Sequence, residues 1–236
     1  MFDRPHHQRI GLVLYALDGT LLRQCNCLFG GGTAISLRHG EFRESVDIDL
    51  VTSDLASYRG LRLSITGANG LEPITRADAP ALKRIREVRA DQYGIRTTIE
   101  VGGEPIRFEI VFEARIELDA PGATDEICGV PTLTALDMAA SKLLANSDRW
   151  ADDGVFSRDL IDLAMMQVPL PLLRRALAKA EGAYGGAVSR DLRRAISKLQ
   201  DNPDRLARCT QAMAMTTPRA LLWQRIRALR RVLPAQ

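Results

Sequence analysis

The stretch that most constrains the fold is residues 28–52, which joins a glycine turn to a strand with two aspartates. Gly30–Gly32 lets the backbone turn tightly and approach a ligand closely. We expect Thr33 to cap a short helix over residues 34–39, and the free N–H groups at its start favour an anion. This part of the chain therefore predicts a phosphate-binding turn.

The second half of the stretch predicts a strand with an acidic face. Residues 46–50 alternate apolar and acidic side chains, so Asp47 and Asp49 share one face about 6–7 Å apart. That separation suits a shared divalent cation or a pair of cations. Without a cation or a basic partner the two carboxylates would repel each other. Arg38 and Arg43 are basic residues that offer compensation without a metal.

A third carboxylate is expected on a later hairpin. Residues 95–101 alternate like a strand, Gly102 and Gly103 form the turn, and residues 106–118 form the returning strand. On the returning strand Glu109 and Glu113 lie on the face opposite the apolar residues. Either of them is a candidate to join the two aspartates.

The remaining periodicity predicts further helices and strands around these elements. We expect Asp159 and Asp162, three residues apart, to face one side of a helix that Ser157 caps, and Lys142 to lie to one side of the preceding helix. The expected helices cover residues 5–22, 79–90, 132–146, 157–166, 172–181, 189–200 and 218–233, and the other expected strands cover 27–29 and 61–65. Together they predict an α/β (α+β) fold with a small mixed sheet flanked by helices and a helical C-terminal part.

Charge divides the 236-residue chain near Gln167. Residues 167–236 hold 14 Lys and Arg against 4 Asp and Glu, a net charge of +10, whereas residues 1–166 hold 18 against 25, a net charge of −7. We therefore expect two domains, 1–166 and 167–236. The basic second domain is either a surface for a polyanion or a solvated arginine-rich face.

Composition also bears on the compartment. The four cysteines include no Cys-x-x-Cys pair, and no apolar run reaches the roughly 18 residues of a membrane span. We expect reduced thiols in a cytoplasmic protein without a membrane partner. His6, His7 and His39 have no partner at metal-ligand spacing, and Trp150 and Trp223 are expected as core or interface residues.

Two motifs resemble a known family. The first is Gly31-Gly32-Thr33-Ala34 followed by Arg43-x-Ser45-x-Asp47-x-Asp49, which is similar to the polymerase-β-type nucleotidyltransferases and, more narrowly, to toxins of the AbiEii/AbiGii type. The second is Lys142, then Arg149, then Arg158-Asp159-x-x-Asp162, which resembles the helical signature of the toxin branch. The resemblance covers about residues 28–166 and implies that they form the catalytic core.

The resemblance implies roles for individual residues. Gly31, Gly32 and Thr33 would hold the nucleotide, Arg43 and Ser45 would brace the loop before the aspartate strand, and Lys142 would contact the triphosphate. Asp47 and Asp49 would bind Mg²⁺ or Mn²⁺, with Glu109 as the third metal carboxylate and Glu113 as its alternative. Asp159 and Asp162 would orient the lysine, the base or the acceptor.

The implied activity is metal-dependent transfer of a nucleoside monophosphate from a nucleoside triphosphate to an acceptor. The basic second domain favours tRNA or another RNA as the acceptor, and the family implies a cognate antitoxin protein. Two alternatives stay open: transfer to a protein or to a small molecule such as an aminoglycoside, and a non-catalytic nucleic-acid-binding relative.

Overall fold

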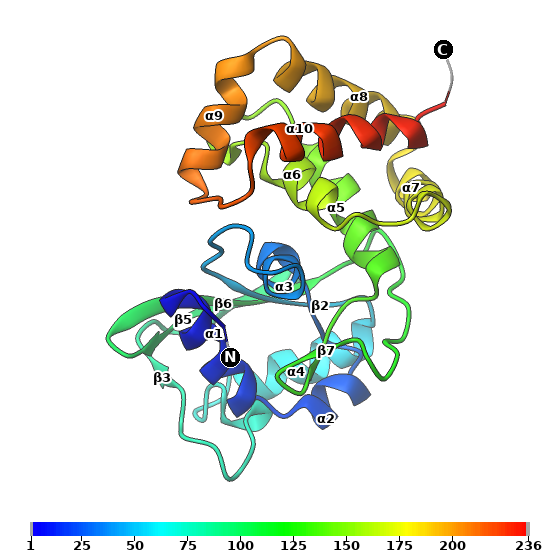
Figure 1. Cartoon of the computed structure of the whole chain (residues 1–236). Coiled ribbons are helices and arrows are strands. Elements are labelled where there is room, and N and C mark those ends of the chain that lie inside the picture. The colour runs from blue at the N-terminus through cyan, green and yellow to red at the C-terminus, as the bar shows by residue number, and fades with distance from the viewer. Residues whose placement is uncertain (1, 235–236) are drawn as a thin grey trace. The chain divides into compact units, whose positions relative to one another are not determined.

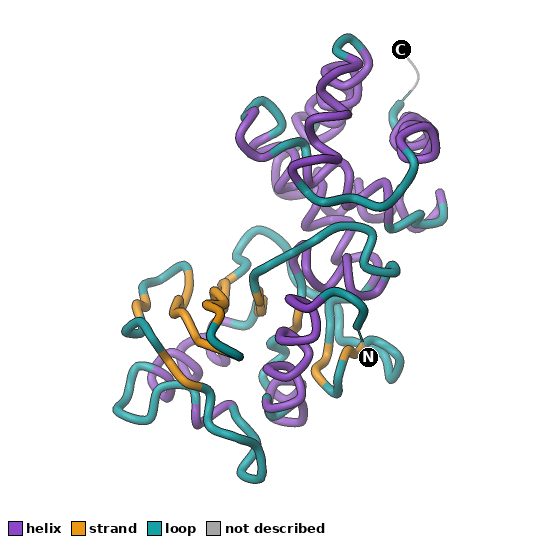
Figure 2. Tube along the Cα trace, turned by 60° about the vertical axis from the view of Figure 1, so that its left-hand side comes forward, coloured by secondary structure: helices purple, strands orange, loops and turns teal. Residues whose placement is uncertain are grey.

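The computed structural model describes residues 2–234, which form a mixed α/β structure with two compact units (Figure 1). The sheet unit consists of Met1–Arg38 and Ser45–Thr134, and the helical unit consists of His39–Glu44 and Ala135–Gln236. Strands occur in the sheet unit, whereas the helical unit is built from helices and loops (Figure 2). The predicted mixed sheet flanked by helices is confirmed.

The main sheet of the sheet unit is ordered β1-β2-β6-β5-β3, with β4 also pairing with β5. Its pairing is antiparallel except between β2 and β6, which run parallel. Its strands are β1 Leu28–Phe29, β2 Ile48–Thr52, β3 Lys83–Arg84, β4 Arg89–Ala90, β5 Gly94–Val101 and β6 Glu104–Phe112, and a separate pair comprises β7 Glu126–Ile127 and β8 Val130–Pro131.

One face of β2 and β6 is mainly apolar and belongs to the core. Ile48 and Leu50 lie opposite Phe108 and Ile110 in the parallel register, and all four side chains have no exposed surface. Helices α3 and α4 pack against β2. The helices of this unit are α1 Pro5–Ala16, α2 Gly19–Gln24, α3 Gly31–Arg38 and α4 Leu55–Ile65, with the 3₁₀ turn η1 Glu72–Ile74. Because alternate strand residues point to opposite faces, burial of the apolar set turns the acidic set outward.

The helical unit is arranged around α5. This helix packs against α6, α7 and α8, and α6 packs in turn against α10. The helices are α5 Ala135–Arg149, α6 Arg158–Met165, α7 Leu170–Tyr184, α8 Ala187–Gln200, α9 Pro203–Ala212 and α10 Arg219–Ala228, with 3₁₀ turns η2 Asp153–Val155 and η3 Leu229–Val232. Leu143, Leu144, Leu160 and Ile161 have no exposed surface and form the centre of this core.

Several predicted elements are confirmed with small changes in their ends. The hairpin turns at Gly102 and Gly103, which both have positive φ, as a two-residue turn between antiparallel strands requires. The returning strand ends at Phe112 and not at residue 118. Strand β2 begins at Ile48, so Val46 lies before the strand and is 48% exposed, in contrast to its predicted place on the buried face.

The strand predicted for residues 61–65 is wrong, because these residues end helix α4. The Asp54 carboxylate accepts a hydrogen bond from Ser57 N at 2.6 Å and starts the helix. Leu61 and Ile65 are buried while Leu63 is 75% exposed, which is the pattern of a helix face with four-residue spacing. Alternation over five residues fits both a strand and a helix, and the Asp54 cap decides for the helix.

The helix predicted for residues 79–90 is also wrong. This stretch contributes the short strands β3 and β4, which pair with β5. The single helix predicted for residues 5–22 is divided at Leu17, and Asp18 caps α2 through Leu21 N. Helix α9 was not predicted. For residues 79–90 pairing with β5 overrides the apolar spacing, and for residues 5–22 the cap at Asp18 does so.

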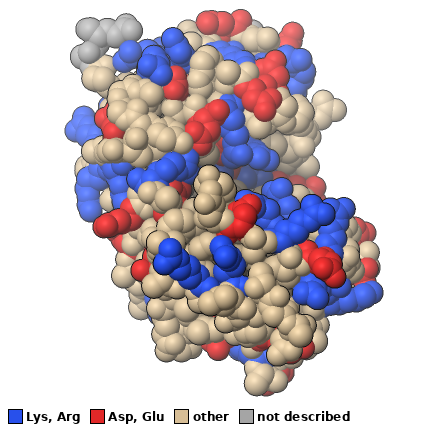
Figure 3. All heavy atoms as spheres, turned by 180° about the vertical axis from the view of Figure 1, so that it is seen from behind, with Lys and Arg blue, Asp and Glu red and all other residues tan. Residues whose placement is uncertain are grey.

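The compact units divide between Thr134 and Ala135, whereas charge places the change near Gln167. The reason is packing: the apolar sides of α5 and α6 are covered by the C-terminal helices of the same unit. By this division the sheet unit holds 14 Lys and Arg against 17 Asp and Glu, a net charge of −3, and the helical unit holds 18 against 12, a net charge of +6. On the face drawn in Figure 3, basic and acidic side chains are interspersed.

Two sequence expectations concern thiols and membranes. Cys25, Cys27, Cys128 and Cys209 are all free thiols. Burial raises the pKa of the Cys27 thiol, which has no exposed surface. Within residues 2–234 no helix combines the length and the apolar character that crossing a membrane requires.

Candidate functional site

The sheet unit presents an acidic face at the start of β2. Asp49 lies within the strand, and Asp47 lies directly before it. The side chain of Asp47 is 27% exposed and accepts a hydrogen bond from Arg107 Nη2 at 2.7 Å. Arg107 comes from β6, so the predicted need for a basic partner is met by a residue that the sequence analysis did not consider.

The register of β2 against β6 places a third carboxylate beside this pair. Asp49 is the direct partner of Glu109 in the parallel pairing, so the two side chains lie on the same face. The Glu109 carboxylate accepts a hydrogen bond from Arg96 of β5. Glu113 lies just beyond the end of β6, is 5% exposed and is bound by Arg115 at 2.7 Å. Of the two candidates for a third carboxylate, Glu109 is the neighbour of Asp49.

The glycine turn lies directly against Asp49. Gly30 N donates to Asp49 O at 2.8 Å, and Gly31 begins α3 with a φ of 67°. A Cβ atom added to Gly31 would lie 3.0 Å from Asp49 Cβ and would collide with the Asp49 carboxylate oxygen. Glycine is therefore needed at position 31 both for its backbone conformation and for the approach of the turn to the acidic strand.

Gly32 and Thr33 lie inside α3 and not before it. The expectation that Thr33 caps the helix is therefore wrong. The Thr33 hydroxyl instead donates a hydrogen bond to Ser45 Oγ at 2.8 Å. Ser45 N in turn donates to His7 Nε2 at 3.1 Å. The chain of contacts holds the segment before β2 between α1 and α3.

His7 is the residue of this group that sequence reasoning missed. It lies in α1 with no exposed surface, and accepting a hydrogen bond requires that Nε2 carry no proton. The adjacent His6 contacts Val46 O through Nε2 at 3.0 Å. His7 lies three residues before the buried Ile10 and so on the same side of α1, but no sequence signal connects it with Ser45.

The residues on the acidic face fit a divalent cation that is coordinated both by protein carboxylates and by phosphate oxygens of a bound ligand. Mg²⁺ is typically held by one or two carboxylates together with substrate phosphates and water, and Asp47 and Asp49 supply two carboxylates on one face. Over residues 2–234 no cluster of three or more His, Cys, Asp or Glu side chains is arranged to hold a metal by itself. Two carboxylates fill only part of the coordination shell of such an ion, so this donor set suits a metal that also binds phosphate and water.

The helical unit contains a buried cluster of charges, here called the ion cluster: Arg43, Lys142, Arg149, Asp159 and Asp162. Lys142 Nζ lies 3.0 Å from Asp159 Oδ1 and 2.8 Å from Asp162 Oδ2, so the two aspartates share one side of α6 as predicted. Arg43 binds both oxygens of Asp162 at 2.6 and 2.9 Å. Arg149 binds both oxygens of Asp159 at 2.6 and 2.9 Å.

Burial and pairing act in opposite directions on the pKa values of the ion cluster. For Asp159 and Asp162 burial alone would raise the pKa, but the neighbouring Lys142 and arginines outweigh burial and hold both pKa values below the ordinary range. For Lys142 burial would lower the pKa, and the carboxylates of Asp162 and Asp159 reverse this and raise it. All members of the cluster are therefore charged at neutral pH.

The local backbone around the ion cluster differs from the sequence prediction at Ser157. Ser157 precedes α6 as predicted, but its φ is 52° and its side chain makes no capping hydrogen bond. Phe156 also has a positive φ. Arg205 from α9 binds Asp153 at 2.6 Å and holds the loop that contains both residues. The chain enters α6 through this loop, which leads directly to Asp159.

We predict that Lys142→Met destabilises the protein by about 3–5 kcal/mol, because two buried carboxylates then lose a shared cation. Urea unfolding followed by circular dichroism measures the change. The control is Lys83→Met, which removes an exposed pair with Glu100 and should cost less than about 1 kcal/mol. Equal losses in the two variants would show that the ion cluster contributes little.

The ion cluster also predicts how stability depends on pH. The stability that Asp159 and Asp162 contribute is present above the unfolded aspartate pKa of about 3.9 and is lost as the pH falls through their lowered folded values. The contribution of Lys142 is present below about pH 10.4 and is lost as the pH rises through its raised value. We expect a plateau in unfolding free energy from about pH 5 to 9, and undiminished stability at pH 2 would contradict it.

Comparisons with known proteins agree with the sequence resemblance. A search of curated proteins finds no match. Among solved structures the chain is similar to "Crystal structure of putative nucleotidyltransferase from H. pylori", with 16% identity and a TM-score of 0.50 over 97% of this chain and 94% of that chain. At this identity the likeness supports the fold alone.

The family comparison covers almost the whole chain. The family described as "Nucleotidyl transferase AbiEii toxin, Type IV TA system" matches residues 13–231, which include the acidic face, the glycine turn and the ion cluster. The family implies a nucleoside triphosphate as substrate and an antitoxin as partner. The chain therefore belongs to the AbiEii nucleotidyltransferase toxin family.

Proposed function

We propose that the protein transfers a nucleoside monophosphate from a nucleoside triphosphate to an RNA acceptor such as tRNA, with Mg²⁺ or Mn²⁺ as cofactor. The observation that carries the proposal is the approach of the Gly31 turn to Asp49. It brings a helix start that favours phosphate next to carboxylates that favour a cation. Phosphoryl transfer needs these two features because positioning and charge neutralisation provide most of its catalysis.

In this proposal Asp47 and Asp49 hold the metal, and Gly31, Gly32 and Thr33 hold the nucleotide phosphates. A bound divalent cation neutralises charge that develops on the phosphate oxygens and lowers the pKa of a coordinated hydroxyl. Arg107 and Arg96 occupy the carboxylates of Asp47 and Glu109, and both arginine side chains are partly exposed. With a divalent cation held by the carboxylates, both arginines would be available to contact phosphate oxygens, because their partly exposed side chains have room to change rotamer.

Glu109 is the proposed third carboxylate and would accept the proton of the attacking hydroxyl. Its position as register partner of Asp49 supports this role. Arg43 and Ser45 brace the loop before the acidic strand. Arg43 binds Asp162, and Ser45 accepts a hydrogen bond from Thr33. For Lys142 we propose only that Asp159 and Asp162 orient its amino group, because that group is buried between the two carboxylates and cannot also contact a triphosphate.

The acceptor is proposed from charge. The helical unit carries a net charge of +6, and its last part, residues 167–236, carries +10. Such an excess of Lys and Arg favours a polyanion such as RNA. Incubation with each labelled nucleoside triphosphate, and with total RNA, protein extract or an aminoglycoside, separates the possible acceptors. Label only on protein or on the aminoglycoside would overturn the RNA assignment.

We predict that Asp47→Asn and Asp49→Asn each lower pyrophosphate release by at least roughly 100-fold, because each removes a charge on which metal binding depends. Circular dichroism should show an unchanged fold. The control is Asp78→Asn, whose side chain is 81% exposed and should leave turnover unchanged. Turnover near the wild-type level in either Asp47→Asn or Asp49→Asn would refute the metal assignment.

We predict that Gly31→Ala abolishes nucleotidyl transfer, because the added Cβ would push the turn away from Asp49. Gly103→Ala is a matched control: Gly103 also has a positive φ, of 83°, but nothing lies within 4 Å of an added Cβ. Both substitutions cost about 1 kcal/mol of backbone strain. Only Gly31→Ala should lose activity, measured as pyrophosphate release, and equal activity in the two variants would contradict the proposed role of the turn.

A further inference from the structure

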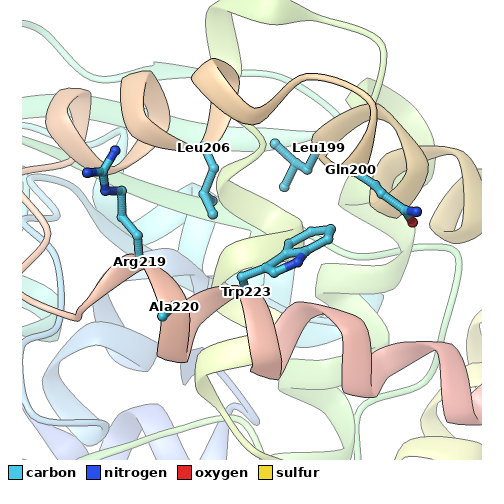
Figure 4. A pocket seen from close by; sticks show the side chains of 6 residues that line it. All are labelled: Leu199, Gln200, Leu206, Arg219, Ala220 and Trp223. Atoms are coloured by element: carbon cyan, nitrogen blue, oxygen red, sulfur yellow. The ribbon is translucent and has the colours of Figure 1, made fainter.

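The helical unit contains a pocket of about 350 Å³ that the proposed chemistry does not use (Figure 4). It is lined by Leu199 and Gln200 of α8, Leu206 of α9, and Arg219, Ala220 and Trp223 of α10. Figure 4 shows the Trp223 ring extending from α10 toward the side of the pocket that Leu199 and Gln200 line. The volume lies near the lower end of the range for small-molecule sites, about 300–1,000 Å³, and so suits a single planar ring system.

Trp223 was expected as a core or interface residue, but it lies in the middle of a row of arginines. Arg219, Trp223, Arg227 and Arg230 follow one another at spacings of four, four and three residues, which places them on one face of α10 and its 3₁₀ continuation η3. The Arg227 guanidinium carbon lies 5.8 Å from the centroid of the Trp223 ring. We call these three arginines the arginine stripe.

The pocket and the arginine stripe are connected through Gln200. Arg230 Nη2 donates to Gln200 Oε1 at 2.7 Å, so the amide that lines the pocket is held in place by the stripe. Among the described residues that line the pocket none is acidic, and Arg219 is charged. Asp201 and Asp204 lie in the nearby turn and first part of α9 and are exposed. The lining itself is apolar apart from the Gln200 amide and the basic Arg219.

This combination is the one that single-stranded nucleic acids use. An aromatic ring stacks on a base, apolar side chains cover the base, and arginines contact the phosphates on either side. An amide such as that of Gln200 matches the hydrogen-bonding edge of an unpaired base. A helical peptide would instead need a row of apolar pockets at successive turns, whereas this pocket holds one ring.

We propose that the Trp223 pocket binds one unstacked base of a single-stranded RNA segment, with the arginine stripe along its phosphates. That this RNA is also the acceptor of the nucleotide rests on the proposed function. The binding itself needs no turnover. An inactive variant therefore separates failure of the binding proposal from failure of the catalytic one.

The experiment uses the full chain with Asp49→Asn and Trp150→Phe, so that no turnover occurs and Trp223 is the single tryptophan. Short single-stranded RNA is titrated while tryptophan emission is recorded, with inorganic polyphosphate and an acidic peptide, both of similar charge, as the comparisons. We expect RNA to quench the emission to saturation because a base stacks on the ring, and polyphosphate to leave the emission largely unchanged. Quenching should weaken as salt rises, because phosphate contacts release counterions.

Variants then locate the site. In the Asp49→Asn chain, Trp223→Ala should weaken RNA binding by roughly 5-fold to 100-fold, measured by fluorescence anisotropy of labelled RNA, and Trp223→Phe should retain most of the affinity. Trp150→Ala is the matched control, because Arg194 and Lys198 also lie over the Trp150 ring but Trp150 does not line the pocket. Arg227→Glu should weaken binding, whereas Arg174→Glu, at an exposed position of α7, should not.

Three outcomes would overturn the proposal. RNA binding that is unchanged in Trp223→Ala would place the RNA elsewhere. Equal quenching by polyphosphate would reduce the site to charge alone. Quenching by an acidic peptide and not by RNA would make the surface a protein docking site. If Trp223→Ala unfolds, Arg227→Glu still decides the question, because the Arg227 side chain is exposed and its replacement removes nothing from the core.

Discussion

The parallel pairing of β2 with β6 is the constraint on which the acidic face depends. It places Asp49 beside Glu109 and lets Arg107 reach Asp47, while the alternate residues of both strands fill the core. A slip of one residue would bury the carboxylates and expose Ile48 and Leu50. The apolar face therefore fixes the position of the charged face. Burial of the apolar side chains sets the spacing of the carboxylates on the opposite face.

Like charges on one strand face need compensation, and for Asp47 and Glu109 arginine supplies it. Asp47 is paired with Arg107 and Glu109 with Arg96, both through partly exposed side chains. Such pairs contribute little to stability, because water competes for both partners. A face held by weak, exposed pairs is well suited to exchange its arginines for a cation and phosphates, whereas a fully buried set of pairs would resist that exchange.

The ion cluster of the helical unit is the opposite case. Lys142 lies between two carboxylates, each of which is also held by an arginine, and four of the five side chains are almost completely buried. Desolvation of these charges is costly, so the cluster is stable only while every member is present. Arg43 reaches it from the short segment His39–Glu44, which ties that segment to α6. The cluster explains why the spacing of Lys142, Asp159 and Asp162 forms a recognisable motif.

Local signals predicted the parts of the fold that are held by local interactions. The two-residue turn at Gly102 and Gly103 and the alternation that follows it are short-range features, and the hairpin is present. Residues 61–65 and 79–90 were assigned to the wrong element because their apolar spacing fits more than one period. A side-chain cap at Asp54 decided the first case and pairing with β5 decided the second.

The sequence by itself determined the family, the mixed sheet and the residues that carry the motifs, because these depend on residue type and on spacing along the chain. The tertiary structure decided which of these residues meet. It made Glu109 the neighbour of Asp49, brought His7 to Ser45, placed Lys142 between two aspartates, and set Trp223 in a pocket among arginines. Each of these contacts joins residues from different elements, and the packing of apolar faces brings those elements together.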